Sequence, residues 1–290
     1  MHSRVNKRIV LTALLASMAF VSTDAMAYSL GDFFRGAPND IKAANTGAYI
    51  GIGKTNFNYK EIAGKNMPVP PGGTLDAENG KIKSYLIGIN GQFSYVYWAL
   101  NMNYASGDTA YTGGYTTSSG QSGTLDTTDH QKKLSYNLEL GPTISPEKHI
   151  ALTPLAEIGM RVWDRKLSGG TGSGGVQVSG YSEAYLNTWT AFGGKIDLAY
   201  GPVDLSLVDL DGKTHHGNMT TGNMGFSLGD HSWKQQRVRL VYTFDKWIGL
   251  FASYQHTKFG YGASKYNSQG YMEPNSLTDN HSYYVGVKLG

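Results

Sequence analysis

The stretch from Trp233 to Phe259 decides the fold and reads WKQQRVRLVYTF, then DKW, then IGLFASYQHTKF. Its first half alternates, so Arg237 and Arg239 share one face while apolar side chains fill the other. A period of two predicts β-strands, and the three-residue link predicts a hairpin. An apolar face that ends in aromatics, opposite a face with Arg, Gln and Ser, is typical of a membrane barrel with a polar lumen. The apolar face comprises Val238, Leu240, Tyr242, Phe244, Ile248, Leu250, Ala252 and Tyr254.

The first 27 residues have the order of a secretory signal peptide. A basic start is followed by an apolar run over residues 9–21 and then by Ala25-Met26-Ala27, which is a small-x-small exit. The apolar run is shorter than the ~20 residues that a membrane-spanning helix needs. We therefore expect cleavage near Ala27 and a secreted mature protein.

The composition fits a secreted barrel. The chain has 38 Gly, 20 Tyr and no Cys, which excludes disulfides and a lipoprotein anchor. No run after the signal is long and apolar enough for a membrane helix, and otherwise only closed barrels span a bilayer. The formal net charge of +3 gives no reason to expect nucleic acid as a partner. A soluble β-sandwich or adhesin is the alternative.

Long and short connections alternate over residues 47–290. Five polar stretches are predicted as long loops and four as short turns, which gives about ten strands with both ends on the short-turn side. We predict an all-β fold, a closed antiparallel transmembrane β-barrel of about ten strands, with eight or twelve as alternatives. Residues 28–46 do not alternate and are predicted to form a periplasmic or plug segment. The predicted long loops are 61–80, 107–129, 166–180, 211–230 and 260–279, and the short turns lie near 91–95, 142–149, 201–202 and 245–247.

These features resemble the Gram-negative outer-membrane β-barrel proteins over residues 47–290. The resemblance implies location in the outer membrane, insertion by the assembly machinery, and contact with outer-membrane lipid and lipopolysaccharide. It also implies long loops available to an extracellular or host ligand. The last strand alternates like the terminal assembly signal of such barrels but ends in Leu289-Gly290 rather than on an aromatic residue.

The strand count and loop pattern also resemble the omptin proteases, which use aspartates and a His–Asp pair at the barrel rim. The resemblance would place these roles in the second and fourth long loops. This sequence departs from the pattern, because Gly-Lys-Thr separates Asp211 from His215 and the second loop has no clear Asp-x-Asp. Solvated loop residues are the alternative. The candidate positions are Asp126, Asp129, His130, Asp209, Asp211, His215 and His216.

Two further kinds of site find little support. Lipid-acting barrel enzymes place Ser and His together on the outer face. Here Ser253 and His256 are on opposite faces of their strand, and Ser282 and His281 are on opposite faces of theirs. The adjacent pair His215-His216 has no third ligand at a fixed spacing, so no metal site is predicted. We expect no catalytic residues and no cofactor.

The most informative residues are the charged side chains that alternation turns inward, seven positive and five negative. Charges in a narrow barrel are unfavourable unless they are paired, so we expect a salt-bridge network with Tyr and Trp that fills the lumen. Glu157 and Glu183 are expected to balance the arginines. The predicted network is Lys133, Glu139, Glu157, Arg161, Arg165, Glu183, Lys195, Asp197, Asp204, Arg237, Arg239 and Lys288, with Trp163, Tyr181, Tyr185 and Trp189 as lumen aromatics.

The sequence therefore predicts a non-enzymatic outer-membrane barrel for envelope structure or surface interaction. A narrow porin-like channel for small solutes, with weak anion preference, is the alternative. The balance of lumen charge favours the filled barrel, since opposing walls of a small barrel can meet.

Overall fold

The computed structural model describes residues 36–64, 72–116, 119–245 and 247–290. The predicted signal peptide lies outside these residues. Helix α3 (Asn39–Ala44) precedes the barrel, and a 3-10 turn, η2 (Ser173–Gly175), lies between two short strands. None of the described helices has the length and apolar character needed to cross a membrane.

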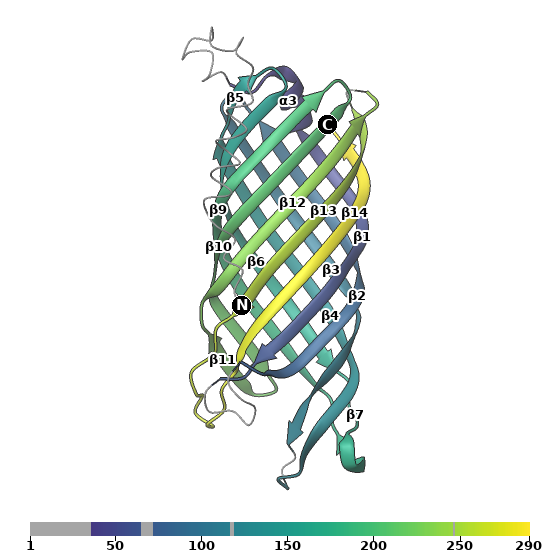
Figure 1. The fold of residues 1–290 in the computed structure, drawn as a ribbon, viewed down its shortest axis with the longest axis vertical. Coiled ribbons are helices and arrows are strands. Elements are labelled where there is room, and N and C mark those ends of the chain that lie inside the picture. Colours follow the sequence, from purple (N-terminus) through teal and green to yellow (C-terminus); the bar gives the residue numbers. More distant parts are fainter. Residues whose placement is uncertain (1–35, 65–71, 117–118, 246) are drawn as a thin grey trace.

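Ten long antiparallel strands form one closed barrel in the described part of the chain (Figure 1). Consecutive long strands pair with each other, and the first pairs with the last, which closes the sheet. The predicted fold class and the count of ten are confirmed. The long strands are β1 (Gly47–Ile62), β2 (Thr74–Gln92), β3 (Val96–Thr116), β4 (Ser122–Pro142), β6 (Ile150–Leu167), β9 (Tyr181–Tyr200), β10 (Val203–Thr221), β12 (His231–Thr243), β13 (Ile248–Tyr261) and β14 (Asn275–Leu289), and the short ones are β5 (Ile144–Glu147), β7 (Gly170–Thr171), β8 (Gln177–Val178) and β11 (Met224–Leu228).

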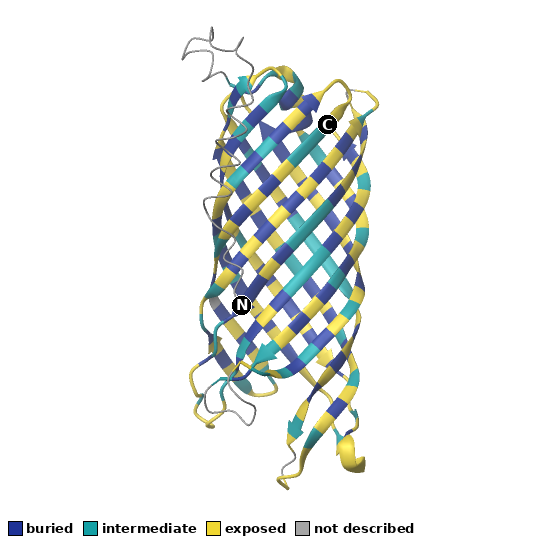
Figure 2. Cartoon of the chain, viewed as in Figure 1, coloured by how far each residue is buried: buried dark blue, intermediate teal, exposed yellow. Residues whose placement is uncertain are grey.

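Buried and exposed residues alternate along the strands, as Figure 2 shows. The apolar side chains are the exposed ones: Ile52 is 62% exposed and Leu138 is 42% exposed. Arg237 and Arg239, by contrast, are both buried inside. A soluble sheet would turn its apolar face inward, so this inverted pattern marks an outer surface that faces lipid and a polar interior.

The strands run further than the sequence predicted, which corrects the long-loop assignments. Residues 74–80 belong to β2, 107–116 to β3, 122–129 to β4 and 211–221 to β10. These parts are rich in Thr, Ser, Gly and Asp and lack apolar alternation, because beyond the lipid no apolar outer face is required. Backbone pairing continues there, and β3 stays paired with β4 up to Thr116 and Ser122. The paired extension of β3 and β4, here called the β-wall, reaches beyond the rest of the barrel in Figure 1.

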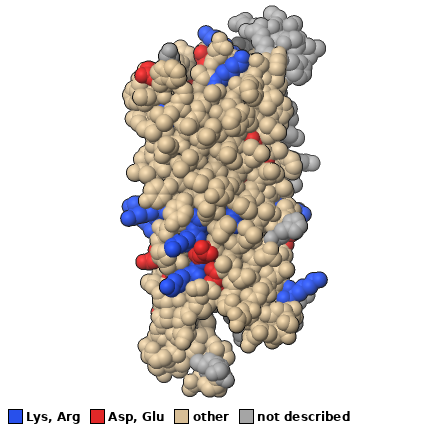
Figure 3. All heavy atoms as spheres, turned by 180° about the vertical axis from the view of Figure 1, so that it is seen from behind, with Lys and Arg blue, Asp and Glu red and all other residues tan. Residues whose placement is uncertain are grey.

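Outward-facing charges gather toward the long-connection end. Figure 3 shows them as a belt, with few charges over the broad region above it. Exposed aromatics lie nearer the apolar band along their strands: Tyr136 is four residues from Lys132 in β4, and Tyr283 is four residues from Asp279 in β14. An apolar band bounded by aromatics and then by charge is the expected outer surface of a membrane barrel. The belt includes Lys54, Lys83, Lys132, Asp164 and Lys166.

Helix α3 lies at the short-turn end of the barrel (Figure 1). Ile41 is fully buried in a cluster with Ala151 and Ala199 of the barrel wall. The Lys288 ammonium donates to the Ala43 carbonyl over 2.6 Å, close to the last turn of the helix. The segment before β1 is therefore attached to the inner wall at this end.

Candidate functional site: the lumen

An ion pair between opposite walls crosses the middle of the lumen. Arg237 of β12 donates from Nη1 to Oε1 of Glu139 over 2.7 Å and from Nη2 to Oε2 over 2.9 Å. The Arg237 side chain is 7% exposed and that of Glu139 is 0% exposed. Asn101 and Asn137 donate side-chain amides to Oε1 of Glu139. A bidentate pair with this many donors fixes β12 and β4 to each other across the barrel.

Arg165 lies toward the long-connection end with carboxylates around it. Its Nη1 donates to Oε2 of Glu183 over 2.6 Å and its Nε donates to Oδ2 of Asp129 over 3.2 Å. A short contact joins Arg165 to Glu78. Five strands therefore contribute to one cluster, and its acids outnumber the single arginine. The carboxylates within ion-pair distance of Arg165 are Glu61, Asp76, Glu78, Asp129 and Glu183.

Aromatic rings fill the space beside Arg165. Trp163 stacks on Tyr185 with ring centroids 4.7 Å apart and on Tyr261, from the opposite wall, at 6.4 Å. The Lys133 ammonium lies 3.1 Å from the Phe57 ring centroid, and the Arg161 guanidinium lies 3.7 Å from that of Phe259. A cation over the face of an aromatic ring is attracted to the ring, and the attraction is stronger when the pair is removed from water. At the long-connection end, side chains therefore fill the lumen beside Arg165.

A third group of contacts lies near helix α3. Lys195 contacts Asp197 closely and donates to Oδ1 of Asn45 over 2.7 Å, and Asn45 in turn donates to Oδ2 of Asp197 over 2.9 Å. The Arg239 guanidinium lies 4.3 Å from the Tyr49 ring centroid. A cavity of about 20 Å³ remains between these groups, with Asp204 in its lining, and one of about 60 Å³ remains further along the lumen beside Lys133, Arg161 and Gln235.

Several predicted site residues have other partners than expected. Glu183 pairs with Arg165, but Glu157 makes no ion pair in the described structure. It accepts from Trp189 Nε1 over 2.6 Å and from Asn137 Nδ2 over 2.9 Å, because Glu139 takes Arg237. Tyr181, predicted as a lumen aromatic, is 42% exposed, since it begins β9 at the outer rim.

The omptin-like candidate positions do not come together. Asp211 lies on the outer face of β10 and pairs with Lys234 over 2.9 Å, and Asp126 is exposed and accepts from Thr112. His215 Nδ1 lies 3.2 Å from Asp230 at the surface. The His216 side chain lies outside the described part of the structure. Among the other candidates, Asp129 alone points into the lumen, where it contacts Arg165.

Sequence reasoning missed several acids of the lumen at the long-connection end. Glu61, Asp76 and Glu78 were assigned to a loop, although Glu78 and Asp129 are fully buried. The signal available was spacing by two, which places Asp76 and Glu78 on the face of Ser84 in β2. Glu273, in the connection between β13 and β14, approaches the same cluster through Tyr185. Burial, and then the nearby Glu61 and Glu183, raise the pKa of Glu273 to about 9 against the opposing effect of Arg165.

No protein-family model and no curated protein matches this chain. Among solved structures it is similar to the outer membrane protease OmpT from Escherichia coli, with 10% identity, a TM-score of 0.55, and coverage of 91% of this chain and 99% of that one. The fold is that of a Gram-negative outer-membrane β-barrel. The translocator domain of the autotransporter NalP from Neisseria meningitidis matches with 12% identity, a TM-score of 0.40, and coverage of 98% and 97%. Ail, the attachment invasion locus protein of Yersinia pestis, matches with 11% identity, a TM-score of 0.28, and coverage of 84% of this chain and 99% of that one.

The similarity to OmpT corrects one prediction. We expected a non-enzymatic barrel, but a solved structure that shares this fold is a protease. The prediction is therefore wrong as an inference from barrel architecture, which gives no ground for excluding catalysis. At 10% identity the likeness concerns the fold, and it transfers neither catalytic residues nor a substrate to this chain.

Proposed function

We propose that this protein is a closed, non-conducting barrel of the outer membrane that carries a rigid β-wall above the outer leaflet for interaction at the cell surface. The observation that carries the proposal is the bidentate pair between Arg237 and Glu139, which joins opposite walls in the middle of the lumen. A pore would need water along this path, and a buried bidentate pair at this position supports a closed lumen.

The raised wall supports the surface role. Beyond the apolar band, β3 and β4 remain paired to their tips, and Tyr115 donates to the Ser173 carbonyl over 2.7 Å next to η2. Ser173 Oγ accepts the backbone amide of Thr124 over 2.9 Å. These bonds tie the tips of two hairpins together, so the wall presents a fixed surface rather than separate loops.

Planar-bilayer recording tests the closed lumen. The purified protein should give no steady conductance, and R237A/R239A should melt at a lower temperature and leak. Heat-modifiability of the electrophoretic band serves as the folding control. Steady wild-type conductance that prefers anions, with an unchanged melting temperature in the double variant, would reject the closed barrel in favour of the narrow channel.

We also propose that lipopolysaccharide phosphates bind the outer belt. Lys54 of β1 lies directly opposite Lys83 of β2 in register, and both are exposed. Neither lysine makes an ion pair with another described residue. Directly opposed like charges destabilise a sheet, and an anionic headgroup at this level would offset the repulsion. Lys132 continues the row through Ser106.

The headgroup proposal has its own test. Lipopolysaccharide added to the protein in micelles should raise the melting temperature of wild type, and K54Q/K83Q should lose most of that rise. K234Q is the matched control, because Lys234 already pairs with Asp211. Equal stabilisation of K54Q/K83Q and wild type, or equal stabilisation by dephosphorylated lipid, would contradict the proposal.

A further inference from the structure

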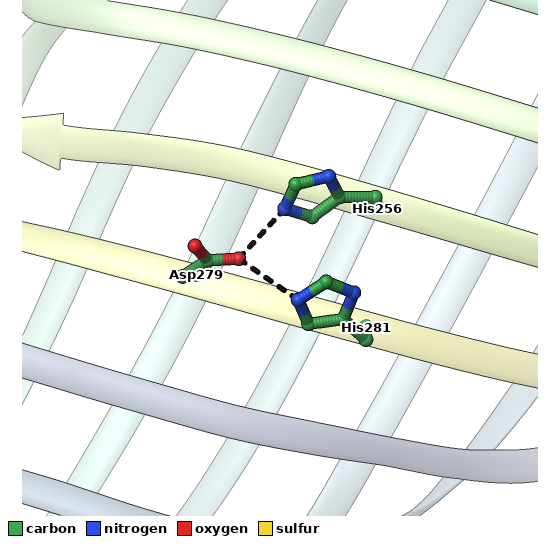
Figure 4. A group of neighbouring side chains, drawn as sticks. All are labelled: His256, Asp279 and His281. Carbon is green, nitrogen blue, oxygen red and sulfur yellow. Dashed lines mark hydrogen bonds and ion pairs between the residues drawn. The ribbon is translucent and has the colours of Figure 1, made fainter. Parts of the chain in front are cut away.

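Three potential metal ligands lie together on the outer face of β13 and β14, outside the lumen network. His256 lies directly opposite His281 in register, and Asp279 lies two residues before His281 on the same face. Figure 4 shows both imidazoles directed at one carboxylate. The side chains are 21%, 39% and 32% exposed, in the order His256, His281 and Asp279, so an ion from solution can reach them.

The ligand atoms are already close to the geometry that an ion requires. Asp279 Oδ1 lies 2.7 Å from His256 Nε2 and 3.3 Å from His281 Nε2. All three ligand atoms lie within 4.8 Å of one another. Ligands about 2.0–2.2 Å from a tetrahedral zinc ion lie about 3.3 Å apart. Binding would lengthen the contact between His256 Nε2 and Asp279 Oδ1 by roughly half an ångström and bring the two imidazole nitrogens, which lie within 4.8 Å, to a similar separation.

Neighbouring side chains hold these ligands in place. The Tyr254 hydroxyl lies 2.8 Å from His281 Nδ1, and the Lys258 ammonium lies 2.8 Å from Asp279 Oδ2, which leaves Oδ1 for an ion. The two imidazole rings stack with centroids 4.2 Å apart and planes 7° apart. Metal-binding histidines characteristically use their second nitrogen in a hydrogen bond, as His281 Nδ1 does with Tyr254, and this bond fixes the ring orientation and the tautomer.

The Tyr254 hydroxyl suits both states of His281. Without an ion, the tautomer with the proton on Nε2 would direct it toward Asp279 Oδ1, 3.3 Å away, and leave Nδ1 to accept from the hydroxyl. With an ion bound, Nε2 supplies its lone pair, the proton resides on Nδ1, and Nδ1–H donates to the same hydroxyl oxygen. The two states differ in which ring nitrogen carries the proton, so binding needs no rearrangement of Tyr254.

We propose that His256, Asp279 and His281 form a binding site for a divalent transition-metal ion of the Zn²⁺ class. Two imidazole nitrogens and one carboxylate oxygen are ligands that such ions prefer. Three protein ligands leave one position for water, which faces outward beside the aromatics Tyr254 and Tyr283. The site thus lies at the boundary between the apolar band and the charged belt, on the side of the long connections.

The test is zinc binding to the folded protein, prepared without a histidine tag and stripped with a chelator. Calorimetry should give one Zn²⁺ per chain, and H256Q and H281Q should each weaken binding about 100-fold or more. Y254F should weaken it about tenfold, in the range for an outer-shell partner. H130Q is the matched control, because His130 forms an outward His–Asp pair with Asp108 over 2.6 Å but finds no third ligand among the described residues.

A second readout does not depend on affinity. Cu²⁺ bound to wild type should show superhyperfine coupling to two nitrogens by electron paramagnetic resonance, and H281Q should show one. Heat-modifiability confirms that each variant is folded. Absence of zinc binding by wild type, binding that survives both histidine substitutions, or an equal loss in H130Q would overturn the proposal and leave the trio as an ion-pair network.

Discussion

The central ion pair gives a prediction whose size follows from burial. Arg237→Met leaves the Glu139 carboxylate in a desolvated position where, among the described residues, the Asn101 and Asn137 amides are its remaining direct donors. Removing one partner of a buried ion pair costs about 3–5 kcal/mol, mostly because the remaining charge stays uncompensated. We therefore expect R237M to lower the free energy of unfolding by about that amount.

The charge-free double variant separates pairing from packing. E139Q/R237M removes both charges, and replacing a whole buried pair with neutral groups is often close to neutral in stability. It should therefore be more stable than R237M alone. The measurement is denaturant unfolding of the barrel in detergent, followed by tryptophan fluorescence and by the heat-modifiable band.

Lys234→Met is the control on the same strand. Lys234 pairs with Asp211, but both side chains are about 60% exposed (59% and 61%), and exposed pairs contribute about 0–1 kcal/mol. The reasoning would be refuted if R237M cost no more than K234M, or if adding E139Q to R237M lowered stability further. Either result would mean that the lumen is wet enough to screen the pair.

Three further predictions test facing, topology and charge. Leu138→Arg should reduce folded yield and heat-modifiability far more than Asn137→Arg, because arginine facing lipid costs about 2–4 kcal/mol at mid-depth whereas position 137 adjoins Glu157; equal yields would invert the facing. Cysteines at Ser119 and Asn223 should label on whole cells with an impermeant reagent and one at Glu147 should not; labelling at Glu147 alone would reverse the topology. The pKa of Glu273, about 9 when folded and 4.5 ordinarily, means that the folded state binds its proton more tightly, so its contribution to stability is complete below about pH 4.5 and is lost as pH rises to about 9. E273Q should flatten this pH dependence in unfolding titrations, and an unchanged slope between these limits would contradict it.

The membrane-spanning part of the fold could be predicted because lipid imposes a pattern. Each strand there must turn apolar side chains outward, so alternation such as Leu134, Tyr136, Leu138 and Leu140 is readable in β4. Because side chains alternate between the two faces of a strand, the positions between the apolar ones were predicted to face inward. This placed Arg161, Arg165, Arg237 and Arg239 inside, and all four are buried. The short turns could be located from the gaps between alternating runs.

The strand extensions at the long-connection end could not be predicted by the same means. Beyond the lipid both faces of a strand are wet or polar, so Thr109 to Asp129 has no apolar period and its composition is that of a loop. The choice of partners across the lumen also stayed hidden. It depends on strand tilt and stagger, which bring Glu139 rather than Glu157 to Arg237. The outer trio depends on cross-strand register, which pairs His256 with His281.

The lumen is built differently at its two ends, and this bears on the proposed closed barrel. In the middle and near helix α3 each close ion pair matches one cation with one acid, as in Arg237 with Glu139 and Lys195 with Asp197. At the outer end five carboxylates surround Arg165, and one oxygen each of Asp76 and Asp129 lacks a hydrogen-bond partner in the described structure. Excess acid at that end is favourable only with added protons or cations. If the barrel is closed as proposed, we expect the matched pairs to hold it closed and the end with excess acid to be the part that responds to added protons or cations.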